Sequence, residues 1–88
     1  MAWTIEYSSA ALRHLRKLGR ATAAEILDYM DNRIAPAQNP RAFGKPLRHD
    51  KHGLWRYRVR DFRVICELDD ERMFVVVLGI GHRSTIYE

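Results

Sequence analysis

The sequence predicts an α+β fold: an N-terminal strand, an antiparallel helical hairpin, and then a three-stranded antiparallel run. Three observations lead to this prediction. Apolar residues alternate with polar ones in residues 2–7 and 54–68, they recur at helical spacing in residues 9–34, and all three prolines fall within residues 36–53. In this order of elements, both helices pack on one face of the sheet. With 88 residues, the chain is expected to form a single domain over residues 1–88.

The first strand is predicted in residues 2–7, where large apolar side chains occupy every second position. Ser8 or Ser9 then offers an N-cap for a helix, and Gly19 ends it. The apolar stripe of this helix is Leu12, Leu15 and Leu18.

A second helix is predicted between Thr22 and Pro36. Thr22 and Glu25 have the spacing of a capping box, in which each side chain bonds to the backbone of the other residue. Its apolar stripe is Ile26 or Leu27, together with Met30 and Ile34. Because only a few residues separate the two helices, they are expected to lie antiparallel.

A loop is predicted over residues 36–53, in which residues 45–47 could be briefly extended. Three strands follow, in residues 54–60, 62–68 and 73–80. The last is apolar throughout, which is typical of a strand in the interior of a sheet rather than at its edge.

Four arginines lie within residues 53–64, "GLWRYRVRDFRV". If Arg60 and Asp61 form a two-residue hairpin loop, the register is fixed, and Arg58 lies directly opposite Arg63. Arg56 shares their face. The other face, expected to meet the helices, then carries Trp55, Tyr57, Val59, Phe62, Val64 and Cys66.

Like charges placed directly across two strands destabilise a sheet, and a face kept only for solubility usually alternates in sign. Clustered guanidinium groups on an open face are well suited to phosphates, which they bind with paired hydrogen bonds. The alternative is a solvated face on which the long side chains fan apart.

The distribution of charge also favours an anionic partner. The chain carries a formal net charge of +4 and has a pI near 9.6. Residues 41–63 hold eight basic and two acidic side chains, a net of +6, so the excess positive charge is concentrated there. This is typical of a nucleic-acid-binding surface, although a generally sticky basic segment would give the same pattern.

The composition excludes other classes of protein. No apolar run approaches the length of a membrane span, and the N-terminus lacks the pattern of a signal peptide. Cys66 is the only cysteine, so an internal disulfide and a multi-cysteine metal site are both excluded. A cytoplasmic location is therefore expected, with no membrane partner. Asp69, Asp70 and Glu71 are adjacent in a turn, where acids are usually solvated, so no metal site is predicted.

The C-terminal stretch "GIGHRSTIYE" brings further candidates. His82 follows the apolar strand, and its imidazole has an unperturbed pKa suited to proton transfer near neutrality. An isolated histidine near a terminus is more often structural. Tyr87 could pack against the fold or stack on a base.

The stretches "KPLRHDKHGLWRYRVRDFRVICELDD" and "VLGIGHRSTIY", with the N-terminal strand and helical hairpin, resemble the RelE/ParE toxin superfamily of bacterial type II toxin–antitoxin systems. The combination of these stretches is specific to the RelE branch, and the resemblance covers essentially the whole chain.

The resemblance implies a ribosome-dependent endoribonuclease that cleaves mRNA in the A site without a metal or cofactor. The implied partners are a RelB-like antitoxin, the ribosome and mRNA, with operator DNA bound through the antitoxin. The implied catalytic set, extended by His82 from its chemistry, is Arg58, Arg63, Arg83, Tyr87 and His82. The residues expected to bind RNA are Arg56, Arg58, Lys45 and Arg48.

The chain departs from the RelE pattern at Arg56 and Arg58, where the RelE toxin has lysines and one of them is regarded as the general base. Arginine stays protonated far above neutral pH and accepts protons poorly. Proton transfer is then left to His82, to Tyr87, or to the ribosome and the substrate. Two other functions remain open: a ParE-like, non-catalytic inhibitor of DNA gyrase, and a plain RNA-binding module.

Overall fold

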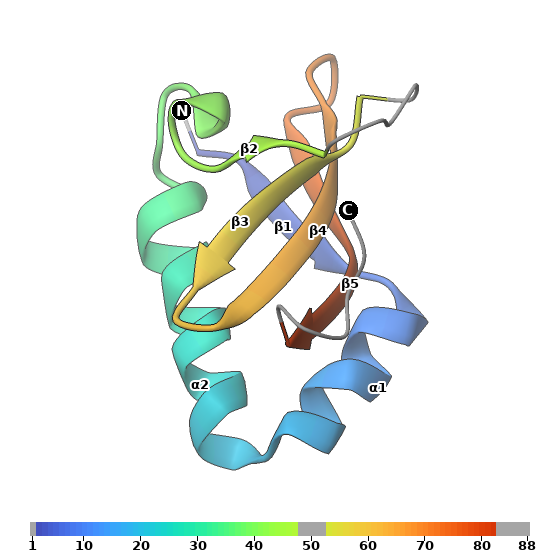
Figure 1. Ribbon diagram of the computed structural model, residues 1–88. Helices are drawn as coiled ribbons and strands as arrows, with labels where there is room; N and C mark the ends of the chain where they lie inside the picture. Colours follow the sequence, from blue (N-terminus) through green and yellow to red (C-terminus); the bar gives the residue numbers. More distant parts are fainter. Residues whose placement is uncertain (1, 48–52, 83–88) are drawn as a thin grey trace.

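The computed structural model describes residues 2–47 and 53–82 (Figure 1). Strand β1 (Thr4–Tyr7) is followed by helices α1 (Ser9–Leu18) and α2 (Arg20–Tyr29) and by the short helical turns η1 (Met30–Ile34) and η2 (Pro40–Ala42). The remaining strands are β2 (Lys45–Pro46), β3 (Trp55–Val59), β4 (Phe62–Asp69) and β5 (Phe74–His82).

The strands form one five-stranded sheet in the order β1-β5-β4-β3-β2. The three C-terminal strands run antiparallel, whereas β1 pairs with β5 in parallel. The predicted α+β class and the interior position of the last strand are confirmed. β5 has a neighbouring strand on each side, and this interior position accounts for its apolar sequence.

Helix α1 packs on the sheet through Ala11 and Leu15, which are buried, whereas Leu12 is 44% exposed and the prediction that it faces the core was wrong. Burial falls on positions 11 and 15, one turn apart, so the side chain of Leu12 points sideways. The hydroxyl of Ser8 caps the helix by accepting a hydrogen bond from the Ala11 N–H at 3.0 Å.

Helix α2 begins at Arg20, two residues before the predicted cap at Thr22, and no side chain caps it. Gly19, with φ near 90°, reverses the chain without a longer linker, so the helix starts immediately after it. Ile26 is fully buried and Leu27 is 36% exposed, which resolves the choice between them. The helix continues as a π-helical turn, whose Met30 and Ile34 are also buried.

The core lies between the two helices and one face of the sheet, and Tyr57 is its largest fully buried side chain. The hydroxyl of Tyr57 donates to the carbonyl oxygen of Pro40 at 2.9 Å. The indole N–H of Trp55 donates to the carbonyl oxygen of Phe43 at 2.7 Å. These bonds hold the segment before β2 against β3, so a stretch without regular sequence periodicity takes a defined position.

None of the helices in residues 2–47 and 53–82 combines the length and apolar character needed to cross a membrane.

Candidate functional site

Strands β3 and β4 form the hairpin that the sequence predicts. All five predicted cross-strand pairs are found, from Val59–Phe62 beside the turn to Trp55–Cys66 at the far end. Arg58 therefore lies directly opposite Arg63, on the face that the helices leave open. The predicted sorting of side chains between the two faces is confirmed.

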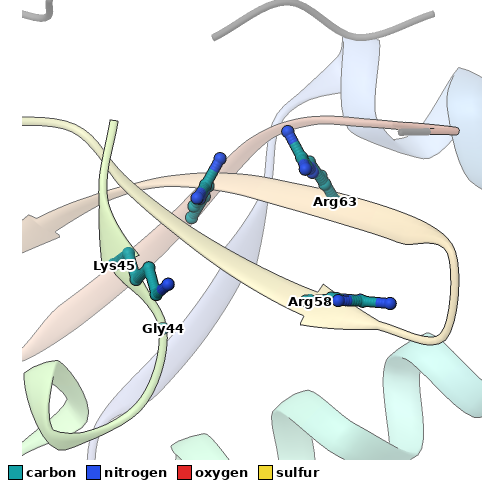
Figure 2. A pocket seen from close by; sticks show the side chains of 5 residues that line it. Gly44, Lys45, Arg58 and Arg63 are labelled. Carbon is teal, nitrogen blue, oxygen red and sulfur yellow. The ribbon is translucent and has the colours of Figure 1, made fainter. Parts of the chain in front are cut away.

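A groove of about 230 Å³ opens on this face. Figure 2 shows Lys45, Arg58 and Arg63 reaching it from β2, β3 and β4. Among the residues that the structure describes, those that line it are Gly44, Lys45, Arg56, Arg58 and Arg63, and none of these five is acidic. We call it the arginine groove.

Two pairs of like charges are built into the arginine groove. Arg58 faces Arg63 across β3 and β4, and Lys45 faces Arg56 across β2 and β3. Like charges directly opposite each other on neighbouring strands destabilise a sheet. The groove therefore gathers four cationic side chains from three strands on one open face.

Gly44 lets β2 approach β3 closely enough to complete the groove. Its φ is +73°, and a Cβ atom placed on it would lie 2.2 Å from the carbonyl oxygen of Arg56. A backbone oxygen cannot move aside as a side chain can, so any larger residue would push β2 away. The position of Lys45 in the groove thus depends on the adjacent glycine.

The hairpin turn orients Arg58. Its Nε–H donates to the carbonyl oxygen of Arg60 at 2.8 Å. Arg60 has φ near 56°, an uncommon conformation for a residue with a side chain, and its guanidinium forms an ion pair with Glu25 of α2. The turn is thereby tied to α2, and Arg60 acts through its backbone outside the groove.

His82 does not line the arginine groove. It is exposed at the end of β5, where it pairs with Phe62, and the two rings meet edge to face with centroids 5.6 Å apart. Directly opposed residues share a face, and Phe62 packs against the core, so the imidazole lies on the helix side of the sheet. The structure brings four of the predicted residues together and leaves His82 apart from them.

Arg48, Arg83 and Tyr87 lie outside the described residues. Their assignments as an RNA-binding residue and as two catalytic residues stay predictions. Gly44 was not singled out from the sequence, although a glycine directly before the extended "KPL" was a signal for a close backbone approach.

Two ionisable side chains of the core, Cys66 and Tyr57, are held in their neutral forms. Burial raises the pKa values of the Cys66 thiol and the Tyr57 hydroxyl well above their usual ranges. Both side chains face the core, so neither is available for proton transfer in the groove. At the far end of the sheet, Arg41 donates to Asp70 and lowers the pKa of that carboxyl.

Comparison with known proteins identifies the family. The model for the "ParE toxin of type II toxin-antitoxin system, parDE" matches residues 5–87. This chain belongs to that family. It is a toxin of a type II toxin–antitoxin system and is RelE-like, as its resemblance to the RelE/ParE superfamily predicted.

Two curated relatives come from Mycobacterium tuberculosis. Toxin RelG is 31% identical over 87 residues, which cover 99% of this chain and 98% of RelG. Toxin RelE from the same organism is 32% identical over 83 residues, which cover 94% of this chain and 84% of that toxin.

Solved structures share the fold. The toxin–antitoxin complex RelBE2 from M. tuberculosis contains a chain that matches with a TM-score of 0.83 and 28% identity, over 96% of this chain and 94% of that one. The intact E. coli RelBE toxin–antitoxin complex matches with a TM-score of 0.72 and 20% identity, over 92% and 96% of the two chains.

Proposed function

We propose that this toxin is a ribosome-dependent endoribonuclease that cleaves mRNA in the A site. The observation that carries the proposal is the arginine groove, where two like-charged cross-strand pairs from three strands line one hollow. Several guanidinium groups gathered on one open face are suited to binding a polyanion such as the RNA backbone. The similarity to toxins named RelE and RelG supports the same reading.

The proposed chemistry uses the 2′-hydroxyl of the RNA as the nucleophile. Its oxygen attacks the adjacent phosphorus, the bond from phosphorus to the 5′ oxygen breaks, and the products are a 2′,3′-cyclic phosphate and a 5′-hydroxyl. The phosphorane between them carries two negative charges. Fixed cations aimed at developing charge often make the largest single contribution to catalysis.

In this proposal Arg58 and Arg63 stabilise the phosphorane together with Arg83, while Arg56 and Lys45 hold the flanking backbone. Arg48 is proposed as a further contact with the RNA. A guanidinium can bridge two phosphate oxygens with parallel hydrogen bonds, and Arg58 is preoriented by its bond to the turn. The cationic lining also repels a divalent metal ion, which supports a mechanism without one.

Two proton transfers complete the reaction: the 2′-hydroxyl loses a proton and the 5′ oxygen gains one. The arginines of the groove stay protonated and cannot accept the first. The imidazole of His82 lies on the other face of the sheet, so the proposal assigns proton transfer to Tyr87, or to groups of the ribosome and the substrate. Tyr87 would otherwise stack on or orient a base.

We also propose that the toxin is neutralised by a RelB-like antitoxin, in line with the RelBE complexes among its structural relatives. The toxin–antitoxin complex would bind operator DNA through the antitoxin. Because its targets are the ribosome and mRNA, the toxin would act in the cytoplasm.

The proposal is tested by adding the toxin to a translating extract and mapping the 5′ ends of the mRNA. New ends confined to the translated part of the message support it, and the same message with its start codon removed is the control. Intact mRNA together with inhibited supercoiling by DNA gyrase would refute it and would favour the ParE-like alternative. Binding to RNA without new 5′ ends in the mRNA would favour a plain RNA-binding module.

A further inference from the structure

The last part of strand β5 lies beside the arginine groove but extends past the end of β1. β1 pairs with β5 only as far as Val77, whereas β5 continues to His82. Among the described residues, no other strand takes the place of β1 beside residues 78–82, so β4 is their one neighbouring strand. This part of β5 bears on the groove because Gly81 lies directly opposite Arg63.

The sequence of this part of β5 makes it a weak piece of strand. The register between β4 and β5 shifts at Leu78, which has no counterpart in β4, and such a bulge disrupts the ladder locally. The next three residues are Gly79, Ile80 and Gly81, and glycine in the interior of a strand weakens it. The segment opposite Arg63 therefore needs support from another element.

Helix α1 supplies this support on the edge of β5 that β1 leaves uncovered. The hydroxyl of Ser8, which also caps the helix, donates to the carbonyl oxygen of Leu78 at 3.0 Å. Further along α1, Nδ1 of His14 accepts a hydrogen bond from the N–H of Ile80 at 3.0 Å. Partly buried backbone groups need partners of this kind. Two side chains of α1 thus do for β5 what a neighbouring strand does elsewhere in the sheet.

The imidazole of His14 is held by packing as well as by its hydrogen bond. A Cβ atom added at Gly79 would lie 3.4 Å from Cε1 and 3.5 Å from Nδ1 of His14, so the ring lies close against the glycine backbone. A ring nitrogen that accepts a hydrogen bond carries no proton, so the proton of the neutral ring is on Nε2. A side chain without an acceptor at this position would leave the Ile80 N–H without its partner.

We infer that His14 is a positioning residue for the arginine groove: by holding Ile80, it fixes the strand that lies opposite Arg63. The inference rests on the proposed function, in which Arg63 stabilises the phosphorane. His14 is not one of the described residues that line the groove, so it acts through the backbone of β5. A misplacement of about 1 Å can slow a reaction by about 100-fold, so the orientation of Arg63 affects the rate of the chemical step.

The test compares two substitutions of nearly equal shape. His14→Asn keeps a hydrogen-bond acceptor near the position of Nδ1, whereas His14→Leu has none. Ile26→Val is the control, because it removes one methyl group from a fully buried side chain of α2 and lowers stability by other means. Thermal melts give the stability of each variant. Cleavage of mRNA is then measured below the lowest Tm, at several concentrations of ribosomes carrying the message, which separates kcat from KM. NMR follows the hydrogen exchange of the Gly81 amide.

His14→Leu is expected to lower kcat by about tenfold and to change KM by about twofold or less, because the other cations of the groove still bind the RNA. The amide of Gly81, which does not itself bond to His14, should exchange faster in this variant. His14→Asn and Ile26→Val should both stay close to the unaltered toxin in kcat and in the exchange of Gly81.

Three results would decide against the inference or against its basis. Equal kcat values for His14→Leu and His14→Asn would overturn the inference and leave the proposed function intact. A loss in His14→Leu no larger than that in Ile26→Val would do the same, because it would show a role in stability alone. If the unaltered toxin cleaves no mRNA, the proposed function fails, and the exchange of Gly81 then decides the inference. Faster exchange in His14→Leu alone upholds the positioning of β5, and unchanged exchange overturns it.

Discussion

Comparing Gly44→Ala with Gly53→Ala should separate the cost of close packing from the cost of backbone conformation. Gly44 and Gly53 have the same φ of +73°, but an added Cβ atom has nothing within 4 Å at Gly53 and lies 2.2 Å from the Arg56 carbonyl oxygen at Gly44. Both substitutions force alanine into a left-handed conformation, which costs about 1 kcal/mol. Only Gly44→Ala adds a collision with backbone.

The additional cost follows from how an overpacked site relaxes. Inserting a methyl group where there is no space costs about 1–3 kcal/mol. The least costly relaxation moves the two-residue strand β2 away from β3, which loses the Leu47 N–H to Leu54 carbonyl bond of 2.9 Å and carries Lys45 out of the groove. Gly44→Ala should therefore be less stable than Gly53→Ala by about 2 kcal/mol, or roughly 10 °C in Tm for a chain of this size.

The assay is a pair of thermal melts, each with and without added phosphate. The unaltered toxin and Gly53→Ala should both gain stability from phosphate, whereas Gly44→Ala should gain less, because Lys45 no longer helps to bind the anion. Equal Tm values for the two variants would refute the argument, since they would show that β2 tolerates a Cβ atom beside the Arg56 carbonyl.

Three further predictions concern Arg58 in the groove, Tyr57 in the core, and the C-terminal residues Arg83 and Tyr87. Arg58→Gln removes the repulsion between Arg58 and Arg63. Unfolding experiments without phosphate should therefore show a free energy of unfolding that is unchanged or raised by a few tenths of a kcal/mol, while mRNA cleavage should fall. A clear loss of stability would contradict the repulsion. Burial raises the pKa of Tyr57 above its ordinary value of 10.0. As the pH rises, this hydroxyl therefore ionises in the unfolded chain before it does so in the folded one. Its contribution to the free energy of unfolding should be constant below about pH 10 and should decline above it. Tyr57→Phe should cost about 1 kcal/mol at neutral pH and should flatten this decline in urea titrations; an unchanged slope would show that other groups cause it. Arg83→Ala and Tyr87→Phe should each lower the cleavage rate by about 100-fold, and full toxicity in both would exclude them from the site.

The hairpin of β3 and β4 could be predicted in detail because its register depends only on residues that are close together in the sequence. A two-residue turn and a strict alternation of side chains leave one register, and that register alone puts Arg58 opposite Arg63. The approximate extent of both helices followed from spacing in the same way. The start of α2 did not, because Gly19 reverses the chain there, whereas the sequence offers a stronger capping signal at Thr22, three residues later.

The relations between distant segments could not be read from the sequence. The alternation that identifies β1 is the same whether that strand pairs with β3 or with β5. The place of β2 depends on Gly44 and on bonds from Trp55 and Tyr57 to backbone carbonyls, which have no sequence pattern of their own. Consequently the arginines of the groove were predictable, whereas the way in which Lys45 joins them was not.

The central position of β5 has a consequence for when the toxin becomes active during its own synthesis. β5 is made after the other four strands of the described sheet, and it separates β1 from the arginine hairpin. Until it emerges, β1 has no partner strand, and the hairpin has neither a complete sheet nor a closed core to hold it rigid. The groove can therefore take its final shape only after the segment that forms β5 has been synthesised.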